Sequence, residues 1–159
     1  MTEVHYDSNS DIFEQDAGLP AAIAIFENDP SPPCQGLPAE GLIAEIKYYD
    51  RGSNQELAYV PSGCWLDEPY ARTCIAPSQA ARLILGIPAE DGIVVVTNCR
   101  FESEHYSEDA ISREWLRGKS FEIEVTLSAG EYTEFVYVFR FEIELEPDIS
   151  IRCLNPSCI

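Results

Sequence analysis

The chain has 159 residues, 45% of them hydrophobic and 11% aromatic, which is enough for one well-packed domain and too little for two large ones. Its 28 acidic and 10 basic residues give a formal net charge of -18, which repels nucleic-acid phosphates and anionic membrane surfaces. We therefore predict no direct binding to nucleic acid or membrane and a preference for basic partners.

The N-terminal segment is polar and acidic. We predict an acidic arm over residues 1–18 that could be mobile, followed by a single globular α+β domain over residues 19–159. The opening letters MTEVHYDSNSD lack the basic start and apolar run of a secretory signal peptide. No apolar run is as long as the roughly 18 residues that a membrane helix needs, so we expect a cytoplasmic protein.

The six cysteines lie at positions 34, 64, 74, 99, 153 and 158, and their spacing matches no common zinc site. A domain of this size can fold without covalent crosslinks, so we expect reduced thiols. A secreted protein with disulfides is the alternative. In that case positions 64 with 74 and 153 with 158 would close short loops.

Strands account for most of the predicted structure. Apolar or alternating runs bounded by turn residues predict them over residues 19–26, 41–49, 56–65, 91–102, 119–127 and 131–146. The run at 91–102 is the richest in β-branched residues and should be a central strand.

Two short helices are predicted between these strands. Within residues 76–88, Pro77 suits a first helical turn and Gly86 is a stop signal. Within residues 107–118, Ser107 suits an N-cap, and acids at the start with arginines at the end suit the helix dipole. The order of elements predicts an α+β domain: a mostly antiparallel sheet of about six strands, as a sandwich or partly open barrel, with two short helices.

The last two predicted strands form the clearest hairpin. They alternate with period two and are joined by the letters SAG, which predicts a three-residue loop ending in Gly130. Apolar side chains of both strands then share one face and glutamates share the other. The predicted pairs are Leu127 with Glu131, Ile123 with Phe135, Phe121 with Tyr137 and Glu124 with Glu134.

The glutamate face of this hairpin has two interpretations. It is either a solvated outer face that protects the sheet from edge pairing or a docking surface for a basic partner. The candidate partner-binding residues are Glu122, Glu124, Glu134, Glu142, Glu144 and Glu146, together with Glu102 and Glu104 from a second acidic cluster.

Catalytic and ligand-binding motifs give little signal. No phosphate-binding glycine loop or nucleophile signature occurs, and the acids around His105 match no calcium or zinc pattern, so we predict no cofactor and no metal. An enzyme that uses His105 or a cysteine is an alternative. The aromatic residues Phe135, Tyr137, Phe139 and Phe141 either fill the core or line a ligand cavity.

These patterns predict a non-enzymatic acidic module that masks a basic surface of a protein partner, as an inhibitor, a toxin-immunity protein or a nucleic-acid mimic does. The main alternative is a β-rich domain that binds a small molecule in an aromatic-lined cavity. Long strands also leave room for a homodimer formed through an edge strand.

Overall fold

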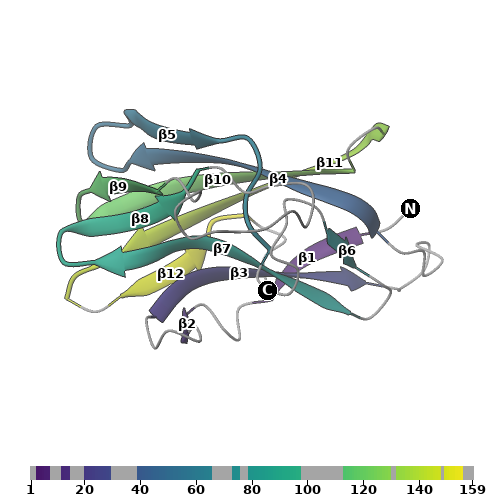
Figure 1. Ribbon diagram of the computed structural model, residues 1–159, viewed down its shortest axis with the longest axis horizontal. Coiled ribbons are helices and arrows are strands. Elements are labelled where there is room, and N and C mark those ends of the chain that lie inside the picture. Colours follow the sequence, from purple (N-terminus) through teal and green to yellow (C-terminus); the bar gives the residue numbers. More distant parts are fainter. Residues whose placement is uncertain are drawn as a thin grey trace.

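The computed structural model describes residues 3–7, 12–14, 20–29, 39–65, 73–75, 79–97, 113–129, 132–147 and 149–155. Within these ranges every regular element is a strand, and the strands form two antiparallel sheets (Figure 1). The prediction of an α+β domain with two short helices is therefore wrong, whereas the predicted antiparallel sheet is confirmed. The described part of the chain has no helix long and apolar enough to cross a membrane.

The first sheet has the strand order β1-β3-β7-β8-β9, and β2 also pairs with β3. Because β1 pairs with the C-terminal half of β3 and β2 with its start, parts of the acidic N-terminal segment belong to this sheet. Its strands are β1 (Glu3–Asp7), β2 (Ile12–Glu14), β3 (Pro20–Asp29), β7 (Ala80–Ala89), β8 (Gly92–Val96) and β9 (Arg113–Arg117).

Strand β7 occupies the segment predicted as the first helix. Its burial alternates, with Ala81, Leu83 and Leu85 in the core and Arg82 and Ile84 on the opposite face. The outer face of β7 is also apolar and partly buried, since Ile87 packs against the buried residues Ile23 and Ile25 of β3, so its sequence is as apolar all round as that of a buried helix. Pairing with β3 along most of its length decided the outcome.

The described part of the second predicted helix, residues 113–117, is strand β9. Leu116 points into the core, while Arg113, Trp115 and Arg117 are exposed. Pairing with β8 outweighs the charge pattern that suited a helix dipole, since that pattern is worth only about 1 kcal/mol. The predicted cap at Ser107 lies outside the described residues.

The second sheet has the strand order β12-β11-β10-β4-β5, and β6 also pairs with β4. The short C-terminal strand β12 has no counterpart among the predicted strands. The strands of this sheet are β4 (Ala39–Asp50), β5 (Glu56–Val60), β6 (Thr73–Ile75), β10 (Ser120–Ala129), β11 (Tyr132–Glu144) and β12 (Ser150–Cys153).

The β10–β11 hairpin has the predicted faces but not the predicted register. The pair nearest the turn, Ala129 with Tyr132, is already offset by three residues from the predicted loop. An irregularity between Ser128 and Ala129 adds three more β11 residues, so the pairs farther from the turn are offset by six. An even shift preserves the faces, so apolar residues still oppose apolar residues. The observed pairs are Leu127 with Tyr137, Ile123 with Phe141, Phe121 with Ile143 and Glu124 with Arg140.

The inner faces of the two sheets form one shared core. Phe26 from the first sheet packs edge-on against Phe139 and Phe141 from the second, with ring centroids 4.9 and 6.3 Å apart. Tyr48 adds a polar link, since its buried hydroxyl donates a hydrogen bond of 2.6 Å to the carbonyl of Leu85 across the core. The aromatic residues of β11 that are described therefore pack in or against the core.

The segment after β5 leaves the second sheet and joins the first. Trp65 forms a β-bridge with Leu83, and the amide of Ile84 donates to the carbonyl of Cys64. Cys64 and Cys153 are each disulfide-bonded, so the expectation of reduced thiols is wrong for these two cysteines.

Candidate functional site

Charged residues on the outer face of the second sheet form the first candidate site. Residue alternation turns these side chains away from the core, and we call this surface the ion-paired face. It brings six acids together with four bases: Glu45, Glu56, Glu122, Glu124, Glu142 and Glu144 with Lys47, Arg51, Arg140 and Arg152. Most of the negative charge on this surface therefore has a positive charge nearby.

Glu142 is the centre of the ion-paired face and is only 6% exposed. Arg152 donates to one carboxylate oxygen at 2.6 Å, and Arg51 donates to the other oxygen and also to Glu144. Burial by itself raises the pKa of Glu142, but the hydrogen bond from Arg152 and the charges of Arg152 and Arg51 outweigh burial and lower this pKa. Glu142 is thus held as a carboxylate that already has its partners.

Smaller interactions engage other acids of this face. Arg140 lies 3.5 Å from Glu124, its cross-strand neighbour. Glu45 accepts a hydrogen bond from Tyr59 and thereby raises the pKa of that phenol. The ion-paired face has most of its negative charge balanced within the protein.

The predicted partner-binding residues separate in the structure. Four of them, Glu122, Glu124, Glu142 and Glu144, lie on the ion-paired face. Glu146 lies beyond the end of β11, in a different site. Glu134 belongs to β11 but its side chain is not described, and Glu102 and Glu104 lie outside the described residues.

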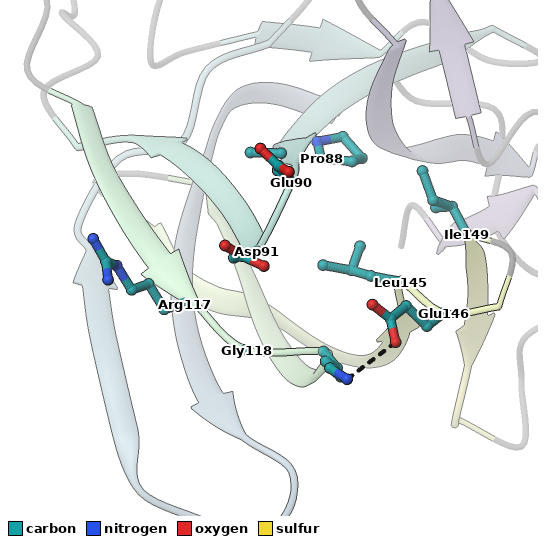
Figure 2. Close-up of a pocket in the computed structure, with 10 residues that line it drawn as sticks. Pro88, Glu90, Asp91, Arg117, Gly118, Leu145, Glu146 and Ile149 are labelled. Atoms are coloured by element: carbon teal, nitrogen blue, oxygen red, sulfur yellow. Dashed lines mark ion pairs between the residues drawn. The ribbon is translucent and has the colours of Figure 1, made fainter.

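A hollow at one end of the sandwich is the second candidate site. Three connections meet there, β7 to β8, β9 to β10 and β11 to β12, and the hollow has a volume of about 370 Å³ (Figure 2). We call it the end hollow, and its lining residues are Pro88, Ala89, Glu90, Asp91, Arg117, Gly118, Lys119, Leu145, Glu146 and Ile149.

Two glycines allow these connections to approach one another. A side chain on Gly92 would place its Cβ 1.9 Å from the carbonyl oxygen of Leu116, so only glycine fits where β8 begins beside β9. Gly118 has φ of +149°, which residues with a side chain rarely adopt. The amide of Gly118 donates to Asp91, and the amide of Leu145 donates to Lys119, so backbone bonds tie all three connections together.

Some charged side chains of the end hollow have partners among the described residues and others have none there. Lys119 lies 3.1 Å from Glu146, and Arg117 places its guanidinium 4.8 Å from the ring of Trp115. Glu90 and Asp91 are exposed and have no ion-pair partner within the described residues (Figure 2). Two carboxylates therefore border the hollow without a fixed counter-charge from any described residue.

Part of the lining of the end hollow is apolar. Pro88, Leu145 and Ile149 belong to it, and Leu145 lies between Asp91 and Glu146 (Figure 2). Ile149 is 38% exposed although it is a large aliphatic residue. The site thus offers hydrophobic contact beside negative charge.

The sequence reading missed Glu90, Asp91 and Lys119 as site residues. The letters DG at Asp91 and Gly92 are a hairpin-turn signal that could have indicated a tight β7–β8 connection. Nothing local could indicate that this turn meets the β11–β12 connection, because those segments are more than fifty residues apart.

Most of the other residues considered for catalysis or metal binding lie outside the described residues. His105 lies outside them, and the described residues contain no group of three histidine, cysteine or acidic side chains placed to hold a metal ion. Comparison of the chain with protein-family models, curated proteins and solved structures finds no match.

Proposed function

We propose that the protein is a non-catalytic binding module that covers a basic surface of a protein partner, as an inhibitor, immunity protein or nucleic-acid mimic does. The observation that carries this proposal is the net charge of -18 combined with exposed carboxylates around a hollow that have no ion-pair partner in the described part of the chain. Long-range attraction by such a charge speeds association with a basic surface and selects against acidic ones.

The end hollow is the better place for that contact. Carboxylates that already have arginine partners must give them up to bind another cation, which cancels much of the gain. Among the residues that the structure describes, Glu90 and Asp91 have no such partners to give up, and Glu146 has one exposed lysine. The role of the other predicted glutamates in partner binding stays a prediction.

The experiment starts with capture of binding proteins by the tagged chain at low and high salt, followed by purification of the captured protein. Its affinity is then measured for the wild type, for Glu90→Lys/Asp91→Lys and for the control Glu27→Lys/Glu114→Lys, which changes net charge equally at exposed acids elsewhere. We expect about tenfold weaker binding for the first variant and a much smaller change for the control. Equal losses would mean that overall charge, and not the end hollow, drives binding.

We also propose that the chain folds in an oxidising compartment, in place of the predicted cytoplasm. Disulfides at Cys64 and Cys153 support this, because reducing compartments keep most thiols free. Thiol counting of the protein isolated from its source, denatured without reductant, tests the proposal. Six free thiols would refute it.

A further inference from the structure

We infer that the end hollow receives one lysine or arginine side chain of a basic partner, with the cationic group at the carboxylates and the aliphatic stem on Leu145 and Ile149. The inference rests on the proposed function, because it assigns the ligand to a side chain of that partner.

The apolar part of the lining favours a ligand with an aliphatic stem. A bare metal ion or ammonium ion gains nothing from Pro88, Leu145 and Ile149, whereas a four-carbon stem buries apolar surface there. The volume of about 370 Å³ is within the range of small-ligand sites, so a long side chain fits with room for its neighbours.

The charge of the lining favours a cationic ligand over an anionic one. Among the described lining residues, Lys119 is paired with Glu146 and Arg117 lies over the ring of Trp115, and three carboxylates stand against these two cations. Glu90 and Asp91 are unpaired within the described residues, so an incoming anion would meet repulsion and an incoming cation would meet two open acceptors.

The positions of the carboxylates relative to the apolar residues suit a long side chain with a charged end. Figure 2 places Glu90 and Asp91 on one side of the hollow and Glu146 and Ile149 on the other, with Leu145 between them. A stem that crosses Leu145 can bring its charged end toward either side. Lys119 then acts as an internal competitor that a partner's cation displaces from Glu146.

The test uses n-butylammonium as a mimic of a lysine side chain. Amide NMR shifts of Gly118 and Leu145 are followed in the full chain during titration with butylammonium, and with ammonium and 1-butanol at equal concentrations and constant ionic strength. We expect saturable shifts with butylammonium and at least about tenfold weaker responses with the other two probes, because each lacks the stem or the charge. Equal responses to ammonium or to 1-butanol, or shifts that never saturate, would overturn the inference.

Variants locate the ligand. Asp91→Asn should weaken butylammonium binding about threefold through loss of charge, and Ile149→Ser should weaken it similarly through loss of apolar contact. Both positions are exposed, so the variants should fold, and Glu27→Gln is the matched control without effect. Unchanged binding in both test variants would also overturn the inference.

The proposed function and this inference fail separately. Binding of a purified basic protein by a chain that ignores butylammonium would leave the proposed function intact and refute the occupant of the hollow. Butylammonium binding without any basic protein partner would refute the proposed function, and with it the assignment of the ligand to a partner's side chain.

Discussion

The ion-paired face and the end hollow both contain carboxylates and basic side chains. They differ in how many of their carboxylates have ion-pair partners. On the ion-paired face, Glu142 is buried between Arg51 and Arg152. In the end hollow, Glu90 and Asp91 have no ion-pair partner within the described residues, and Glu146 has one exposed partner. The density of acids along the sequence therefore does not reveal which acids are available for binding.

The difference follows from where the basic residues fold. Arg51 comes from the β4–β5 turn and Arg152 from β12, and both reach the same glutamate of β11. Such an arrangement contributes to stability and opposes binding, because each arginine would lose its carboxylate to an incoming partner. Each region should respond to substitution in its own way.

The largest expected effect is on stability at the ion-paired face. Glu142→Gln removes the charge between two arginines and should lower the free energy of unfolding by about 2 kcal/mol, measured by urea denaturation. Glu122→Gln is the matched control on the same face, because no ion pair of that residue is known in the described part, and it should cost less than about 0.5 kcal/mol. Equal losses would show that Glu142 has no special role.

The stability difference between the wild type and Glu142→Gln should disappear at low pH. The pKa of Glu142 is lower in the folded chain than its ordinary value of 4.5, so its contribution is complete above pH 4.5 and is lost as the pH falls through the folded pKa. Urea denaturation of the wild type and Glu142→Gln from pH 7 downward should give a difference that shrinks below pH 4.5. A difference that stays constant in strong acid would contradict the assigned ion pairs.

A smaller effect compares the two regions by binding. Glu122→Lys/Glu124→Lys makes the same change of net charge as Glu90→Lys/Asp91→Lys, but on a face where arginines already balance the acids. We expect it to change partner affinity by no more than about twofold, against about tenfold for the end hollow, by titration calorimetry. The reverse ranking would move the binding surface to the hairpin.

The smallest effect comes from the competing cation inside the end hollow. Lys119→Met frees Glu146 from an ion pair whose side chains are 76% and 60% exposed, so unfolding stability should change little. Partner affinity and butylammonium affinity should each rise about twofold to threefold, since one more carboxylate becomes available. A drop in both affinities would mean that Lys119 itself contacts the ligand.

Much of the hairpin could be predicted from sequence, and its limits have a physical cause. Alternation with period two placed Phe121, Ile123, Phe139 and Phe141 on the buried face, because every second side chain of a strand lies on one side. The register was not predictable, since the pairing of Ala129 with Tyr132 and the irregularity beside it together shift the alignment by an even number of residues, which keeps the same faces. Glu124 consequently faces Arg140 and not Glu134.

By itself, the sequence determined the strong negative charge, the antiparallel strands of the C-terminal hairpin and the residues that those strands bury. Tertiary structure decided that residues 80–89 and 113–117 are strands, because pairing with β3 and β8 outweighs local helix signals. It also decided which acids are neutralised and which surround a hollow, because both depend on contacts between segments far apart in the chain. Local patterns record side-chain faces, whereas charge pairing depends on three-dimensional distance.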